Sequence, residues 1–164
     1  MKALNRAFER ALDHSDNRDN IAELLKCIGD ELGCDRICVF EVNDENVCDK
    51  THEWIQRKVK GERLIWQGLS KAMFDAWYGR LCHHEIITIE DTNELKKYDP
   101  VVYQNFVEQG IKRCVVSVLS FHGKAFGFFV LENPGDEAFM DRELLMPGLR
   151  YVLSSMVYSE HLVH

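Results

Sequence analysis

The sequence predicts a single α/β (α+β) domain: a three-layer sandwich with a central antiparallel sheet of about five to six strands and helices on both faces. Several runs in the middle of the chain are apolar on both alternating faces, which is typical of strands that lie between two layers. The connections between these runs are short, which favours antiparallel pairing. Stripes of apolar residues at helical spacing precede, interrupt and follow the runs, so helices can cover both faces.

Two helices are expected at the N-terminal end. Apolar residues recur at helical spacing over residues 2–13 and again over residues 21–32. Asn20 is the expected N-cap of the second helix, and Glu23 stands three residues later as the other member of a capping box. Gly33 is the expected left-handed stop at its C-terminal end.

The strands are expected in the middle of the chain. The run over 47–56 is more polar than the others, which places it nearer an edge of the sheet. The last two strands are joined through a Gly-containing turn and form a hairpin. The predicted strands cover residues 35–42, 47–56, 85–90, 111–119 and 125–131.

Helices are also expected between and after the strands. Ser70 marks the start of one helix, and Asp99 followed by Pro100 marks the start of another, which stops at Gly110. The chain from about residue 141 to its end reads as helical, apart from a kink or restart at Pro147.

Charge and cysteine content exclude several classes of partner. Twenty Lys and Arg against 27 Asp and Glu give a net charge of −7, which argues against a nucleic acid or an anionic membrane as the main partner. The six cysteines form no C-x-x-C pair, and no secretory segment precedes them, so we expect reduced thiols in a cytoplasmic protein. No apolar run is long enough to span a membrane.

Four groups of short motifs, in the right order on the expected elements, resemble the GAF domain family over nearly the whole chain. Val118 departs from the pattern, because the family often has proline there. The matching motifs are CDRICVF at 34–40, HEW at 52–54, IED at 89–91, and QGIKR at 109–113 with GK at 123–124, GF at 127–128 and ENP at 132–134. The resemblance implies one GAF domain over residues 1–164, acting as a non-catalytic regulatory sensor.

The same motifs resemble bacterial GAF domains that precede diguanylate cyclase output domains. No GG(D/E)EF run is present, so the resemblance implies the sensor part of a larger signalling protein, or a free-standing sensor. The output domain would lie in cis or in a partner protein. Residues 1–33 and 141–164 would be the helices that dimerise and carry the signal.

Aromatic residues gather on the second strand and on the middle segments that cover the sheet in this family. Ligand pockets are mostly apolar with a few placed polar groups. The resemblance therefore implies an unknown small-molecule ligand, with His52, Glu90 and Arg113 as polar contacts. The alternative is that the aromatic side chains only form core. The expected ligand-binding residues are His52, Trp54, Trp66, Trp77, Tyr78, Glu90, Tyr103, Phe106, Arg113 and Cys114.

Other chemistries are less well supported by the sequence, and we expect neither a cofactor nor a metal. Residues 82–84 are Cys-His-His, but chain neighbours point in different directions and rarely chelate one ion. A Cys-His pair also occurs in bilin-binding relatives, yet there it lies on the helix before the fourth strand, where this chain has no cysteine. The family's cyclic-nucleotide motif is only partly matched, by Asn133, Phe139 and Asp141.

Two alternative functions remain open. The first is a thiol enzyme resembling free methionine sulfoxide reductases, in which Cys114 is the nucleophile and His52 lowers its pKa. The second is a homodimerisation module without a ligand. A homodimer is expected through the terminal helices, because apolar residues recur at spacings of three and four; the alternative is that both stripes only cover the domain's own sheet. The predicted seam comprises Leu149, Val152, Met156, Ser159 and Val163, beside Leu4, Phe8 and Leu12.

Overall fold

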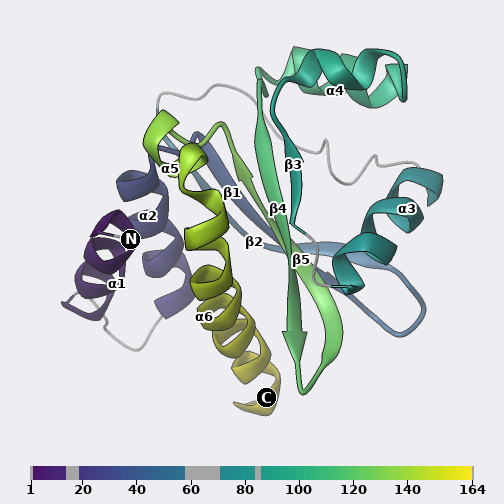
Figure 1. The fold of residues 1–164 in the computed structure, drawn as a ribbon. Coiled ribbons are helices and arrows are strands. Elements are labelled where there is room, and N and C mark those ends of the chain that lie inside the picture. The colour runs from purple at the N-terminus through teal and green to yellow at the C-terminus, as the bar shows by residue number, and fades with distance from the viewer. Residues whose placement is uncertain (1, 14–18, 58–70, 84–85, 164) are drawn as a thin grey trace.

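The computed structural model describes residues 2–13, 19–57, 71–83 and 86–163 (Figure 1). The strands are β1 (Arg36–Val42), β2 (Cys48–Ile55), β3 (Ile87–Ile89), β4 (Cys114–Phe121) and β5 (Lys124–Glu132). The helices are α1 (Lys2–Asp13), α2 (Asn20–Leu32), α3 (Lys71–Cys82), α4 (Pro100–Glu108), α5 (Asp136–Met140) and α6 (Arg142–Val163), with the 3-10 helix η2 (Thr92–Lys96) before α4.

One five-stranded sheet in the order β2-β1-β5-β4-β3 forms the middle layer, and every neighbouring pair is antiparallel. Helices α1, α2, α5 and α6 lie on one side of it, and α3 and α4 lie on the other (Figure 1). The predicted antiparallel sheet with helices on both faces is therefore confirmed. Strand β2 lies at an edge, as its polar character predicted.

The sheet separates two apolar cores because successive side chains of a strand point to opposite faces. On β1, Ile37 and Val39 pack toward α2 and α6, whereas Cys38 and Phe40 pack toward α3 and α4. The two faces are therefore separate chemical environments that share the same strands. None of the described helices combines the length and apolar character needed to cross a membrane.

Two predicted helix ends differ from those observed. Helix α2 is capped by Asp19, one residue before Asn20, and the Asp19 carboxylate accepts from the amide of Ala22 at 2.9 Å. Helix α6 runs without a restart through Pro147. This proline is the sixth residue of α6, so its missing N–H removes only a bond to the carbonyl of Glu143 in the first turn.

The predicted coiled-coil seam on α6 is wrong at its first residue. Leu149 is 0% exposed and packs in the domain's own core with Leu153 and Val157. Val152 and Met156, the next two residues of the predicted seam, are partly buried and pack against the same core. The exposed apolar side chains of the helix are instead those of Leu144, Tyr151 and Leu162.

Candidate functional site

Four of the expected ligand-binding residues lie together on the face of the sheet that α3 and α4 cover. Phe106 and Cys114 are fully buried there, and two aromatic side chains of α3 pack against the same core. The ring of Tyr78 is 6.3 Å from that of Phe128, which stacks on Phe40 at 4.9 Å. These residues give the otherwise aliphatic core of this layer an aromatic wall on one part. The four are Trp77, Tyr78, Phe106 and Cys114.

His52 and Trp54 lie on the opposite face, so the single pocket expected from the sequence does not form. The Trp54 ring packs directly on helix α2, where a Cβ added to Gly29 would lie 2.1 Å from a ring carbon. The Nε2 atom of His52 is 3.1 Å from the carboxylate of Glu160 on α6. The pairing of His52, Glu53 and Trp54 with β1 is regular, and the irregularity of this strand pair follows at Thr51, an extra residue of β2 between the partners of Val39 and Phe40.

Tyr103 lies on the outer side of α4 rather than in the aromatic wall. Its hydroxyl donates to the side-chain oxygen of Asn93 at 3.3 Å, and the ammonium of Lys96 lies 5.9 Å from its ring centroid. These contacts stabilise the packing of α4 on η2. Trp66, the remaining aromatic residue of the expected site, lies outside the described residues.

A buried cluster of charged residues, none of them among the expected ligand-binding residues, occupies the α3/α4 face. Arg36 and Glu132 are partners across β1 and β5, with Nε and Oε2 3.0 Å apart and side chains only 2% and 1% exposed. Glu53 on β2 lies 4.0 Å from Arg36 Nη1 and 2.7 Å from the ammonium of Lys50. The thiol of Cys38 donates to Glu132 at 3.6 Å and to Glu53 at 3.7 Å.

The guanidinium of Arg36 has unused hydrogen-bonding capacity. Its Nε and Nη1 atoms are buried, and neither makes a hydrogen bond of good geometry, although Nε is in ion-pair contact with Glu132. A guanidinium carries five N–H donors, and buried polar groups in proteins are nearly always satisfied. Two cations and two carboxylates make the cluster formally neutral. It is therefore a set of donors and acceptors without excess charge.

A sequence signal for this cluster existed. Arg36 is the first residue of the apolar strand β1, and Glu132 is the last residue of the apolar strand β5. In each strand the charged side chain lies on the same face as the apolar side chains two and four residues away. A charged residue at an inward position of a buried strand requires a partner, because burying an unpaired charge is strongly unfavourable. Arg36 lies within the predicted strand 35–42 and Glu132 directly follows the predicted strand 125–131, so each residue signals the need for a buried partner without identifying that partner.

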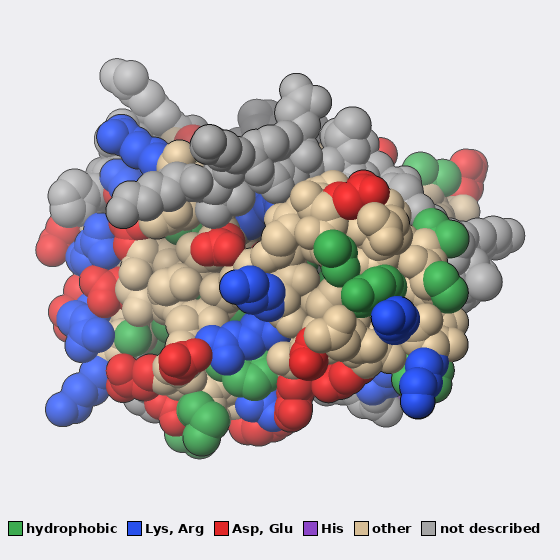
Figure 2. Space-filling view, turned by 90° about the horizontal axis from the view of Figure 1, so that it is seen from above, with side chains coloured by type: hydrophobic (Ala, Val, Ile, Leu, Met, Phe, Trp, Pro, Cys, Tyr) green, Lys and Arg blue, Asp and Glu red, His purple; other side chains and the backbone are tan. Residues whose placement is uncertain are grey.

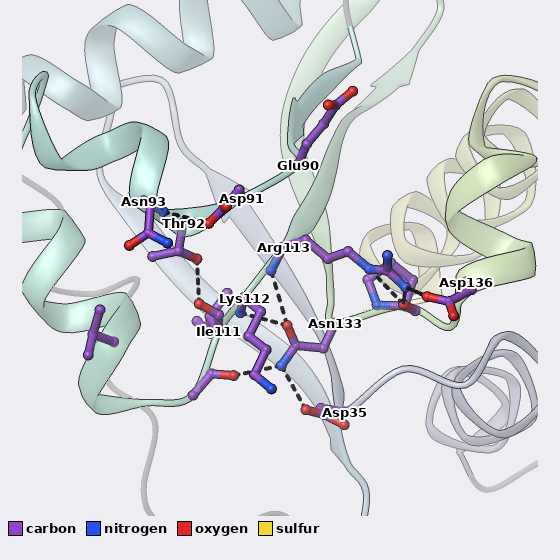
Figure 3. A pocket seen from close by; sticks show the side chains of 13 residues that line it. Asp35, Glu90, Asp91, Thr92, Asn93, Ile111, Lys112, Arg113, Asn133 and Asp136 are labelled. Atoms are coloured by element: carbon purple, nitrogen blue, oxygen red, sulfur yellow. Dashed lines mark hydrogen bonds and ion pairs between the residues drawn. The ribbon is translucent and has the colours of Figure 1, made fainter.

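Glu90 and Arg113 lie at a second site, a polar groove of about 990 Å³ at one end of the sheet (Figure 3). The groove lies where β1 and β4 begin and β3 and β5 end. Its lining contains the carboxylates of Asp35, Glu90, Asp91 and Asp136 and the cations Lys112 and Arg113. Viewed from this end, acidic and basic side chains are interspersed over the surface, and apolar side chains are scattered between them (Figure 2).

Asn133 holds the floor of this groove together (Figure 3). Its side-chain oxygen accepts from the amides of Lys112 at 2.8 Å and Arg113 at 3.2 Å. Its amide nitrogen donates to Asp35 at 2.7 Å and to the carbonyl of Gly110 at 2.8 Å. All these polar groups are satisfied within the fold, so this part of the ENP motif has a structural role.

Arg113 joins the sheet to α5, and Glu90 joins it to the start of α6. Arg113 donates to the carbonyl of Pro134 at 2.7 Å, and its guanidinium lies 4.6 Å from the ring centroid of Phe139. Arg142 stacks on the same ring at 4.5 Å and contacts Glu90 at 3.4 Å. Both predicted polar contacts are thus engaged within the protein.

The thiols do not have the environment of a catalytic cysteine. Burial raises the pKa of Cys114 far above its ordinary value, and the charge of Glu132 raises it further. His52 lies on the opposite face of the sheet, so the prediction that it lowers this pKa is wrong. Because the thiolate is the reactive form, these surroundings disfavour nucleophilic chemistry at Cys114. All six cysteines are free.

The remaining chemistry considered from the sequence receives no support from the geometry. Within the described ranges, no three His, Cys, Asp or Glu side chains are grouped to hold a metal ion. Cys82 lies exposed at the end of α3, and His84 lies outside the described residues. Helix α4, which precedes β4, contains no cysteine.

Comparisons with known proteins identify the fold. No protein-family model matches the chain, and no curated protein matches it. Among solved structures, GAF3 from Slr1393 of Synechocystis sp. PCC6803 has a TM-score of 0.67 at 15% identity, covering 85% of this chain and 91% of that one. The phycoerythrobilin-bound GAF domain from a cyanobacterial phytochrome has a TM-score of 0.66 at 15% identity, covering 99% and 96%. The cyanobacteriochrome TePixJ GAF domain gives 0.64 at 17% identity, covering 92% and 95%. The chain therefore has the GAF fold.

Proposed function

We propose that the chain is a cytoplasmic sensory domain of a bacterial signalling protein and binds a small molecule between the sheet and helices α3 and α4. The observation that carries the proposal is the buried guanidinium of Arg36, which lies with its charged neighbours beside the apolar side chains of this face. Its Nε and Nη1 donors lack hydrogen bonds. Such a combination of an aromatic wall and a few polar groups is characteristic of a ligand site.

The charge of the cluster narrows the class of ligand. Arg36 is compensated by Glu132, and Glu53 is compensated by Lys50, so a ligand with a large net charge would meet repulsion from one pair or the other. A neutral or zwitterionic molecule with a carbonyl or carboxylate oxygen would accept from Arg36 without this cost. Its apolar part would lie against the rings of Phe40, Phe128 and Tyr78.

The solved GAF domains support a ligand on this fold, since one is named as bound to phycoerythrobilin and another to phycocyanobilin. We do not propose a covalently attached bilin for this chain, because α4 has no cysteine. Ligand binding would instead be non-covalent.

Helix α6 is the proposed output element, leading to a diguanylate cyclase-type domain in cis or in a partner protein. It packs along the sheet on the face opposite the ligand and shares strands β1, β4 and β5 with it. A parallel homodimer would form through the exposed stripe of Leu144, Tyr151 and Leu162. The ligand would shift the population between two packings of this helix.

Native mass spectrometry of the purified chain, followed by a metabolite screen read by tryptophan emission and thermal stability, tests the proposal. We expect a ligand to raise the melting temperature and to change the emission of Trp77. The double variant Arg36→Met, Glu132→Gln removes the donors without leaving a buried charge unpaired, and should abolish the response while the chain still folds. A complete absence of co-purified or added ligands that change either signal would instead support the ligand-free dimerisation module.

A further inference from the structure

The last turn of α6 is attached to the sheet differently from the rest of the helix. Within the described residues, Val157 is the last side chain of α6 that is buried in the apolar core. Beyond it, Tyr158 stacks on Phe121 with ring centroids 3.9 Å apart and lies edge-on to Phe126 at 5.5 Å. The remaining attachments are polar.

Two histidine–carboxylate pairs supply these polar attachments, and they are arranged crosswise. His52 on β2 faces Glu160 on α6, with Nε2 and Oε1 3.1 Å apart. His161 on α6 faces Glu41 on β1 through its own Nε2 atom. The sheet thus contributes the imidazole to one pair, from β2, and the carboxylate to the other, from β1. Both pairs join α6 to the β1–β2 edge.

Protonation of the imidazole strengthens the interaction in both pairs. A neutral imidazole donates a single hydrogen bond to the carboxylate, whereas a protonated one forms an ion pair with it. The Nδ1 atom of His52 lies 3.0 Å from the hydroxyl oxygen of Thr51. A hydroxyl can donate to the neutral ring or accept from the protonated ring, so both forms of His52 fit the site.

The charged groups around the two imidazoles are acidic. Glu41 on β1 is paired in register with Asp49 on β2, and both line a groove of about 280 Å³ with His161 and Tyr158. Glu160 comes from α6 itself. In the described part of the chain, no ion pair joins either imidazole to α2 or to the β4–β5 hairpin. A proton on either ring therefore adds charge opposite to that of its neighbours.

We infer that the His52–Glu160 and His161–Glu41 pairs form a pH-sensitive latch that fixes the last turn of α6 to the β1–β2 edge. The ion-paired form of the latch requires protonated imidazoles, so acidification favours it and a rise in pH weakens it. Because α6 is the proposed output helix, the latch would make its last turn respond to protons independently of any ligand.

Amide hydrogen exchange of residues 158–163 in the full chain tests this inference at pH 5.5 and 8.0 and low salt. After correction for intrinsic exchange, we expect protection to be higher at pH 5.5 by about two- to fivefold for each pair, the range for exposed ion pairs. The values stay modest because His161 is 60% exposed and Glu160 is 45% exposed. Protection of residues 149–157 monitors whether the core stays folded.

Variants assign the effect to the two histidines. We expect His52→Gln and His161→Gln each to remove the change in protection that its own pair contributes. The double variant should remove the pH response of protection entirely. His83→Gln, at the exposed end of α3, is the matched control and should keep the full response. Equal protection of wild-type residues 158–163 at both pH values would overturn the latch, and so would a pH response that persists in the double variant.

Discussion

The contact between Gly29 and Trp54 allows a test in which a substitution that normally stabilises a helix is expected to destabilise this protein. Replacing a mid-helix glycine with alanine typically gains about 1 kcal/mol. At Gly29, however, the new Cβ would lie 2.1 Å from one ring carbon of Trp54 and 2.3 Å from another. Carbon atoms pack at roughly 3.5 to 4.0 Å, so the rigid ring must retreat by about 1.5 Å.

Such overpacking costs about 1–3 kcal/mol and opposes the helical gain. We therefore expect Gly29→Ala to lower the free energy of unfolding by up to about 2 kcal/mol. Urea unfolding followed by circular dichroism measures this as a shift of the midpoint at constant slope.

The control removes the ring. In a Trp54→Leu background, Gly29→Ala meets no aromatic edge and should stabilise the chain by up to about 1 kcal/mol, so the sign of its effect reverses. If Gly29→Ala stabilised both backgrounds equally, Trp54 would not pack on α2 as described. The conclusion that Trp54 does not belong to the expected ligand site would then have no structural support.

Three further outcomes are expected. Arg36→Met should lower the free energy of unfolding in urea by about 3–5 kcal/mol, because it leaves Glu132 buried without its cation. Adding Glu132→Gln should recover most of this loss. A small effect of the single change would contradict a tight buried pair. Native maleimide labelling at pH 7 should modify the exposed Cys82 first. Burial raises the pKa of Cys48 to about 11, so Cys48 should react more slowly and its labelling rate should increase as the pH rises toward that value. Mass spectrometry of the labelled peptides decides the order. Tyr151→Asp should convert the proposed homodimer into a monomer in light scattering, since the side chain is 75% exposed in the single chain; an unchanged mass would exclude this stripe as the dimer contact.

The layered fold was predictable because its signal is local. Alternation over β1, β4 and β5 and the caps at Asp99 and Gly33 are each visible within a few residues, and the structure confirms them. The N-cap of α2 was misplaced by one residue because Asp19 and Asn20 are both good caps and only the backbone conformation distinguishes them.

The candidate site was less predictable because it depends on which face each strand residue occupies. An extra residue in a strand transfers the side chains beyond it to the other face, and Thr51 is such a residue of β2, directly before the HEW motif. The position of Trp54 in that motif does not by itself show which face of the sheet its ring occupies. The partner of Arg36 lies 96 residues away along the chain, at Glu132, so no local pattern identifies the pair.

Strand β1 connects the proposed ligand site to the latch, which leads to a reciprocal prediction. Arg36 points from one end of β1 toward α3 and α4, and Glu41 near the other end holds His161 of α6. If a ligand on Arg36 shifts β1, it changes the protection of the last turn of α6 by some factor. Thermodynamic linkage then requires that forming the latch change the ligand's affinity by the same factor. Titrating ligand binding at pH 5.5 and 8.0 in the wild type and in the His52→Gln, His161→Gln variant measures that factor. Suppose that a ligand alters the protection of α6, but that its affinity depends on pH to the same extent in the wild type and in the double histidine variant. This result would refute a coupling through β1.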